Sequence, residues 1–148
     1  PRAEALLFAA ARSDHVERLI RPALAAGEWV ICDRFVDSSR AYQGGAGGLS
    51  DADVLALHRV GSEGLLPDLT LLIEVPPHVA AARTAARDGD ATDRIGGRDA
   101  AYHARVAASF ARLAEEEPQR FARIDGDGEA AVVHDRIMAA LARFGVAP

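Results

Sequence analysis

The chain has 148 residues, of which 49% are hydrophobic and only 5% aromatic, and its formal net charge is −5 at pH 7. This length fits a single domain that buries roughly 70% of its unfolded surface. The acidic balance argues against nucleic-acid binding, and no apolar run approaches a membrane span. With Cys32 as the only cysteine, a disulfide within the chain is excluded. We expect a soluble, cytoplasmic protein.

The first quarter of the chain predicts a helix and a strand. An alanine-rich, helix-periodic stretch from Ala3 to about Ala26 should end at Gly27. The apolar run Trp29–Cys32 is too short for a helix, so it predicts a buried strand ending at the pair Asp33-Arg34. We expect a polar loop over 35–44 and a mobile glycine-rich loop over 44–48.

Ser50 and the acids that follow it predict a capped helix that runs to about Glu63. The stretch Leu69–Val75 is apolar nearly throughout and predicts a strand buried on both faces. Pro76 and Pro77 should open the next helix, because the first helical turn does not use the proline nitrogen. The polar segment from Asp88 to Asp99 predicts a flexible loop.

The last third predicts a helix from Ala100 to about Glu117, a short strand over Phe121–Ile124 and a final helix after the turn 125–128. Strands separated by helices pair in parallel through right-handed crossovers, so we expect an α/β fold. Three strands make a thin sheet, and the chain begins at Pro1 with Met138 as its only methionine. We therefore expect one domain over 1–148 that is the carboxyl-terminal portion of a longer protein.

Ligands of open α/β sheets gather at the carboxyl ends of the strands. Arg34 comes directly after the first predicted strand, and its planar guanidinium matches a phosphate. Asp33 could orient Arg34, contact a substrate or reach magnesium through water. The same pair also fits a surface ion pair that closes a strand.

Further side chains could bind a nucleotide beside this arginine. Ser39, Tyr42 and Gln43 offer a hydroxyl, a phenol and an amide that suit a base and a sugar. Phe8 and Arg12 are four residues apart and share one helix face, so they could stack on a ring and donate to its oxygen. Taken by themselves, the two residues favour a core phenylalanine beside a surface arginine. Three arginines in or beside the polar segment could stabilise a transferring phosphoryl group, or could simply be solvated: Arg87, Arg94 and Arg98.

Two other kinds of site are not supported by the sequence. The chain contains no lysine, so residues 44–48 cannot form a phosphate-binding loop of the G-x-x-x-x-G-K-[ST] type. The five histidines are scattered without the spacing of metal ligands, and we assign no metal site.

Taken together, these segments resemble bacterial thymidylate kinases. The similarity extends over essentially the whole chain and is most specific at the aspartate-arginine-aromatic element with its Ser-Ser-x-Ala-Tyr-Gln-Gly continuation. The matching segments are residues 4–12, 15–17, 20–24, 27–35, 38–44, 66–70 and 92–95.

The resemblance implies a P-loop kinase-like, three-layer α/β/α fold with a parallel sheet, incomplete at its N-terminus. It implies transfer of the γ-phosphoryl group of ATP to dTMP with Mg²⁺, in dTTP biosynthesis, by a homodimer that contacts its partner near 4–24. Phe8 would stack on thymine, Arg12 would approach its carbonyl edge, and Ser39 and Gln43 would lie by the base. Arg34 would hold the phosphate, while Tyr42 would crowd the sugar and disfavour a 2′-hydroxyl group. The lid would be 88–99, with Arg87, Arg94 and Arg98 as catalytic candidates beside Arg34.

This sequence departs from the family pattern in three places. The first strand with its phosphate loop is not present, Ala11 stands where an aspartate is common, and Gly96 stands where an acid is common. We therefore expect the 148-residue chain alone to be inactive. Two alternatives are a kinase for another nucleoside monophosphate or deoxynucleoside, and a non-catalytic remnant that binds nucleotide or dimerises.

Overall fold

The structure is a computed structural model that describes residues 2–88 and 100–145. Its residues form two compact units: 1–66 together with 100–113, and 67–99 together with 114–148.

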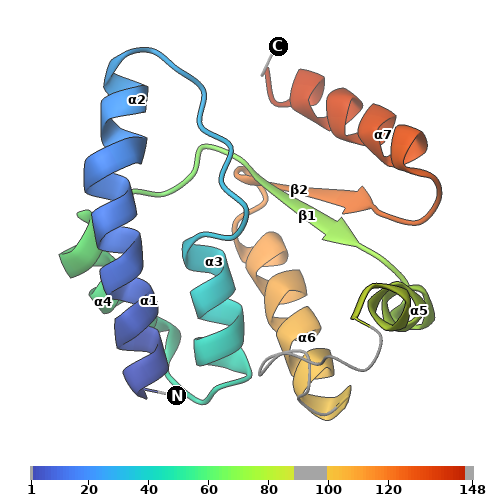
Figure 1. The fold of residues 1–148 in the computed structure, drawn as a ribbon, viewed down its shortest axis with the longest axis horizontal. Coiled ribbons are helices and arrows are strands. Elements are labelled where there is room, and N and C mark those ends of the chain that lie inside the picture. The colour runs from blue at the N-terminus through green and yellow to red at the C-terminus, as the bar shows by residue number, and fades with distance from the viewer. Residues whose placement is uncertain (1, 89–99, 146–148) are drawn as a thin grey trace. The chain divides into compact units, whose positions relative to one another are not determined.

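The first unit begins with one long helical rod (Figure 1), formed by α1 (Arg2–His15), the π-helical segment η1 (Val16–Ile20) and α2 (Arg21–Ala25). Pro22 has no backbone N–H to continue the α-helical pattern. The preceding turn is widened, so that the N–H of Arg21 donates to the carbonyl of Val16. The rod ends before Gly27, whose φ is +77°. The helix expected over 3–26 is confirmed.

The buried strand expected at Trp29–Cys32 is wrong. These residues belong to no strand, and the side chains of Trp29 and Ile31 are 65% and 96% exposed. A strand requires a neighbouring strand to satisfy its backbone groups, and the only sheet of the described residues is two-stranded and does not include this segment. Apolar character alone therefore gave a wrong strand prediction here.

The polar loop expected over 35–44 is also wrong, because this segment is helical. Helix α3 (Val36–Ser39) continues into the π-helical segment η2 (Arg40–Gly45). Val36 and Ala41 are fully buried. Three polar side chains of this helix find partners on other elements: Ser39, Arg40 and Gln43. Gly44 and Gly45, expected to lie in a mobile loop, form the last turn of this helix.

Helix α4 (Asp51–Ser62) has the expected cap: Ser50 Oγ accepts a hydrogen bond of 3.1 Å from the N–H of Asp53. The helix ends where Glu63 and Gly64 adopt positive φ. Helix α4 packs against α1 and contacts α3 and η2. It thereby forms the support on which the α3–η2 helix rests.

The final part of the first unit is residues 100–113 of helix α6 (Ala100–Glu116). Its Tyr102 and Val106 form a small core with Ala41 of η2. The two helices approach closely at Gly45, where an added Cβ would lie 1.7 Å from Ser109 Oγ. Glycine at this position permits the close packing of η2 against α6.

The second unit contains the parallel sheet, in which β1 (Thr70–Glu74) pairs with β2 (Phe121–Asp125). Both strands and the parallel pairing are confirmed, although Ile73 is 51% exposed and β1 is not buried on both faces. Helix α5 (Pro77–Asp88) begins at the predicted prolines. Helix α7 (Ala130–Arg143) packs its apolar face on β2 (Figure 1), where Ala122, Ile124 and Ala140 form the core.

Across the part of the chain that the structure describes, no helix combines the length and apolar character that crossing a membrane requires.

Candidate functional site

The candidate site lies in the first unit, where α1 faces the α3–η2 helix. The guanidinium of Arg12 donates to Ser39 Oγ at 2.9 Å and to the carbonyl of Phe35 at 3.3 Å. Two turns earlier on α1, Glu4 Oε1 accepts a hydrogen bond of 2.7 Å from the side-chain amide nitrogen of Gln43. The later residue of α1, Arg12, thus pairs with the earlier residue of the facing helix, Ser39. Glu4 pairs with the later residue, Gln43, so the two helices run antiparallel.

Phe8 lies between these two polar contacts on α1. Glu4, Phe8 and Arg12 are spaced by four residues and therefore form one stripe along the helix. Ser39 and Gln43 have the same spacing on the facing helix. The side chain of Phe8 is 41% exposed, so its ring has apolar surface open to a ligand.

Arg12 is held from several sides. Its guanidinium lies 5.4 Å from the centre of the Phe35 ring, which in turn contacts the His58 ring edge-to-face at 5.5 Å. Burial lowers the pKa of Arg12 from its ordinary value, while Cys32 and Asp37 oppose this effect. The hydrogen bonds and the stacked ring fix the direction in which Arg12 presents its donors.

Arg34 follows in a tight turn before α3. Its φ is +65°, a left-handed conformation that is uncommon for a residue with a side chain. Its guanidinium stacks on Tyr42 with 5.0 Å to the ring centre, and Nη2 donates to Tyr42 Oη at 3.3 Å. Asp33 beside it is exposed. The structure therefore brings Arg34 and Tyr42 together, at a turn and not at the end of a strand.

Tyr42 is anchored from α6. The hydroxyl of Tyr102 donates to the backbone carbonyl of Tyr42 at 3.1 Å, and the rings of Tyr102 and Phe110 lie 6.3 and 6.2 Å from the Tyr42 ring. This packing holds the ring on which Arg34 stacks.

Sequence reasoning missed three contributors: Glu4, the pair Arg40–Asp51 and Tyr102. Arg40 is 4% exposed and donates twice to Asp51 at 2.9 Å. That hydrogen bond lowers the pKa of Asp51, although partial burial opposes it. Only the four-residue spacing of Glu4 from Phe8 carried a signal in the sequence.

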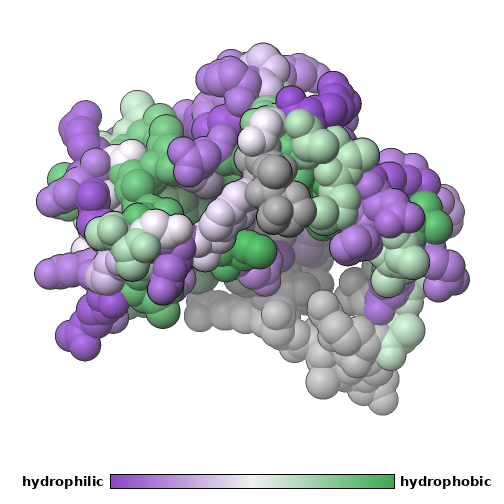
Figure 2. Space-filling view, turned by 90° about the horizontal axis from the view of Figure 1, so that it is seen from above, coloured by the Kyte–Doolittle hydropathy of each residue, from purple (hydrophilic) through white to green (hydrophobic). Residues whose placement is uncertain are grey.

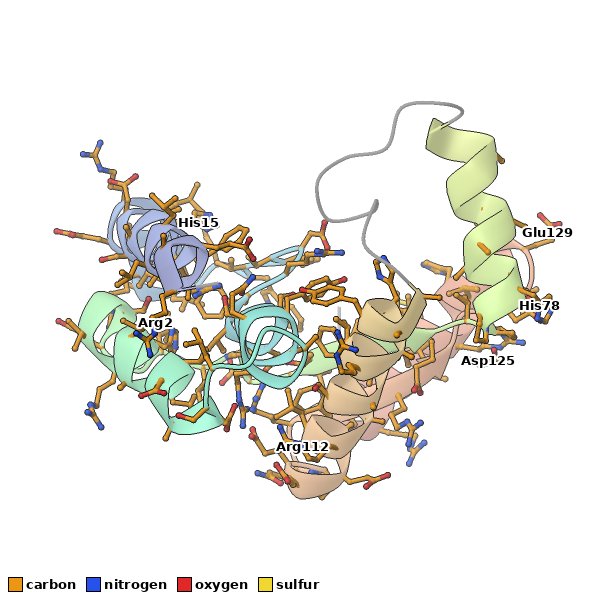
Figure 3. The ribbon with its side chains drawn as sticks, turned by 90° about the horizontal axis from the view of Figure 1, so that it is seen from below. Arg2, His15, His78, Arg112, Asp125 and Glu129 are labelled. Carbon is orange, nitrogen blue, oxygen red and sulfur yellow. The ribbon has the colours of Figure 1, made fainter. Side chains whose placement is uncertain are left out.

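The second unit has a hollow of about 340 Å³ near the carboxyl ends of its strands, lined in part by Ile73, Arg83 and Val133. Arg83 donates to the carbonyls of Gly126 and Gly128, both at 3.2 Å. Asp125, at the end of β2 (Figure 3), accepts from Arg136 at 3.2 Å. The predicted strand-end segments at 74–77 and 125–128 are thus occupied by ion pairs and backbone contacts, including Glu74 with Arg123.

The three arginines in or beside the polar segment lie wholly or in part outside the described residues. Arg87 falls in α5, but its side chain lies outside what the structure describes, and Arg94 and Arg98 lie outside the described residues altogether. Among the residues that are described, no three histidine, cysteine, aspartate or glutamate side chains gather as metal ligands. The chain has no lysine, so no described segment can supply the lysine of a phosphate loop.

Comparison with known proteins identifies the family. The model of the family described as "Thymidylate kinase" matches residues 1–137. Proteins named thymidylate kinase from Rhizorhabdus wittichii, Rhodopseudomonas palustris strain TIE-1 and Bradyrhizobium diazoefficiens are 55%, 48% and 44% identical over 94–95% of the chain. The chain covers 68%, 61% and 62% of their lengths, respectively. Because the family model and these relatives match nearly all of its residues, the chain belongs to the thymidylate kinase family.

Proposed function

We propose that this chain supplies the dTMP side of a dTMP kinase, an ATP-dependent phosphotransferase that forms dTDP in dTTP biosynthesis. The observation that carries the proposal is the antiparallel pairing of α1 with α3–η2. It sets the exposed ring of Phe8 between two polar contacts, Arg12 with Ser39 and Glu4 with Gln43. An apolar ring flanked by hydrogen-bonding groups suits a nucleobase.

At the base end, Phe8 stacks on thymine and Arg12 donates to a carbonyl oxygen of the ring. Arg12 is suited to this role because Ser39 and Phe35 already fix its guanidinium. Ser39 and Gln43 lie beside the base. These side chains bind and orient the acceptor, which is the main contribution of protein groups to phosphoryl transfer.

At the other end, Arg34 holds the phosphate of dTMP as a bidentate donor. Its stacking on Tyr42 keeps the guanidinium in place before the nucleotide arrives. Tyr42 in turn crowds the sugar and disfavours a 2′-hydroxyl group, and Asp33 contacts the substrate or orients Arg34. Asp33 is exposed beside Arg34.

ATP is the phosphoryl donor that family membership implies, and Mg²⁺ accompanies it. When bound, Mg²⁺ neutralises charge on the transferring phosphoryl group. We assign no residue of this chain to hold the metal or the ATP phosphates. Arg34 together with Arg87, Arg94 and Arg98 is proposed to stabilise the developing negative charge, with residues 88–99 as the lid.

The proposal includes the wider assembly. The two units belong to one kinase domain of three-layer α/β/α architecture, which is supported by a family match that continues through both. The active form is a cytoplasmic homodimer with its contact near residues 4–24. Four leucines of the α1–α2 rod are exposed: Leu6, Leu7, Leu19 and Leu24. Figure 2 shows hydrophobic surface on the left of the view, the side on which α2 lies in Figure 1.

The direct test is calorimetric titration of the chain with dTMP, dUMP, dGMP and UMP. We expect dTMP to bind most tightly, dUMP more weakly and the purine and ribonucleotides least. Phe8→Ala should weaken dTMP binding about tenfold or more, because stacking on an aromatic ring contributes about 1–3 kcal/mol per base. Val60→Ala, which shortens an exposed apolar side chain of α4 outside the stripe and outside residues 4–24, is the control. Tightest binding of dGMP or UMP would favour a different nucleotide kinase, and equal binding of all four would overturn the proposal.

A further inference from the structure

Glu4 is the one charged residue of the α1 stripe to which neither the sequence nor the proposed function gives a role. It lies one helical turn before Phe8 and is half-buried. Its Oε1 accepts a hydrogen bond of 2.7 Å from the side-chain nitrogen of Gln43, which is only 3% exposed. A short hydrogen bond that a buried amide donates to a charged carboxylate is strong and directional.

The chemistry of this contact fixes the orientation of the amide. A carboxylate only accepts hydrogen bonds, whereas a glutamine amide has one donor end and one acceptor end. Gln43 must therefore turn its nitrogen toward Glu4, and its oxygen is the group left to accept from a ligand. Arg12, at the other end of the stripe, offers only donors.

The two ends of the stripe thus differ in hydrogen-bonding character. A ring stacked on Phe8 meets donors at Arg12 and an acceptor at Gln43. Thymine and uracil match this pattern, because a carbonyl oxygen lies next to an imide N–H. Cytosine is mismatched at both positions, because it carries an amino group next to an unprotonated nitrogen.

We propose that Glu4 is a specificity-determining positioning residue. By holding the Gln43 amide as an acceptor, it selects a 2,4-dioxopyrimidine nucleotide and rejects the 4-amino analogue. The inference rests on the proposed function, since it requires the base to stack on Phe8. It adds a residue that acts through Gln43 and does not itself contact the substrate.

The first experiment measures the dissociation constants of dTMP and dCMP for the wild-type chain and for Glu4→Gln. The amide in Glu4→Gln can donate or accept, so Gln43 is free to turn its nitrogen toward the base. We expect the preference for dTMP over dCMP to fall about tenfold, the size expected when a mismatched buried polar contact is relieved. Glu17→Gln makes the same chemical change at an exposed position of the rod and should keep the wild-type preference.

The second experiment needs no nucleotide. In a ¹H–¹⁵N correlation spectrum, the side-chain NH₂ of Gln43 should exchange slowly in the wild-type chain, because one of its protons is bonded to Glu4. Glu4→Ala should accelerate that exchange and shift both resonances, whereas Glu17→Gln should leave them unchanged. Unchanged Gln43 resonances in Glu4→Ala would overturn the proposal even if that variant bound nucleotide poorly.

The two possible failures are distinguishable. If wild type binds dTMP but Glu4→Gln keeps the full preference over dCMP, the role of Glu4 is wrong and the proposed function stands. If wild type binds neither dTMP nor dUMP, the proposed function fails and the specificity role of Glu4 fails with it.

Discussion

Arg40 and Asp51 form a doubly hydrogen-bonded ion pair, with Nε to Oδ1 and Nη2 to Oδ2 both at 2.9 Å. Arg40 is 4% exposed, and its Nη1 also reaches Asp37 at 3.4 Å within its own helical segment. Asp51 begins α4, so the pair ties η2 to the N-terminus of that helix. Ser39 and Gln43, which flank Arg40, depend on this tie for their position opposite α1.

Breaking the pair should destabilise the fold strongly. Arg40→Met removes the guanidinium that bonds the carboxylates of Asp37 and Asp51, and loss of one member of a buried ion pair typically costs about 3–5 kcal/mol. Urea unfolding followed by circular dichroism measures the change. Arg18→Met is the matched control, because its ion pair with Asp14 is exposed and should contribute about 0–1 kcal/mol. Equal losses in the two variants would show that burial of Arg40 does not matter.

His58 should make stability depend on pH near neutrality. Burial lowers its pKa below the ordinary 6.5, and Arg12 lowers it further, while the hydrogen bond to the carbonyl of Leu65 and the charge of Asp37 oppose the shift. Below pH 6.5 the unfolded chain binds a proton at His58 more readily than the folded chain does. The stability that the neutral His58 contributes is therefore complete above pH 6.5 and is lost as the pH falls through the lowered pKa of the folded state.

The measurement for this histidine is the midpoint of urea unfolding between pH 5 and 8. We expect His58→Gln to flatten the decline in stability below pH 6.5, since glutamine can still donate to Leu65 but does not titrate there. His15→Gln alters an exposed histidine and should leave the decline unchanged. An undiminished decline in His58→Gln would contradict the assignment.

Gly45 should tolerate no side chain while Ser109 faces it. In Gly45→Ala the new methyl group would lie 1.7 Å from Ser109 Oγ and 2.8 Å from its Cβ, so η2 and α6 must move apart. We expect a loss of about 1–3 kcal/mol, as for other overpacked cores. In the double variant with Ser109→Gly, much of this loss should be recovered relative to Ser109→Gly alone. Strict additivity of the two changes would argue against the close approach.

Replacing Arg34 should weaken the binding of a nucleotide and leave the binding of the matching nucleoside unchanged. If it binds the phosphate, Arg34→Ala should weaken dTMP binding about 10- to 100-fold, because hydrogen bonds to charged groups contribute about 1.5–3 kcal/mol. Thymidine, which lacks the phosphate, should bind the variant and the wild type equally. Calorimetry with both ligands measures the difference, with Arg18→Ala as the exposed control. A parallel loss of thymidine affinity would assign Arg34 to the base or to folding.

Most helices and both strands of the described sheet could be predicted because their signals are local. The serine cap of α4, the prolines that open α5 and the glycine that ends the α1–α2 rod each act within one helical turn. Similarly, the stripe of Phe8 and Arg12 follows from helical periodicity alone. The family resemblance also lies in the residue order, and the matched family model bears it out.

Tertiary structure alone determined the secondary structure of the segment from Trp29 to Gly45. An apolar run predicts a strand only if a neighbouring strand pairs with it, and no local pattern reports that neighbour. The polar residues that follow this run form a helix whose side chains bond to Glu4, Arg12 and Asp51. These partners belong to other elements and lie 11 to 39 residues away along the chain, so no local pattern reports them. The residue types in the sequence determine which groups could bind a nucleotide. The orientation of Arg12 and Gln43 is determined by packing between helices, because hydrogen-bond partners distant in sequence are brought together only by folding.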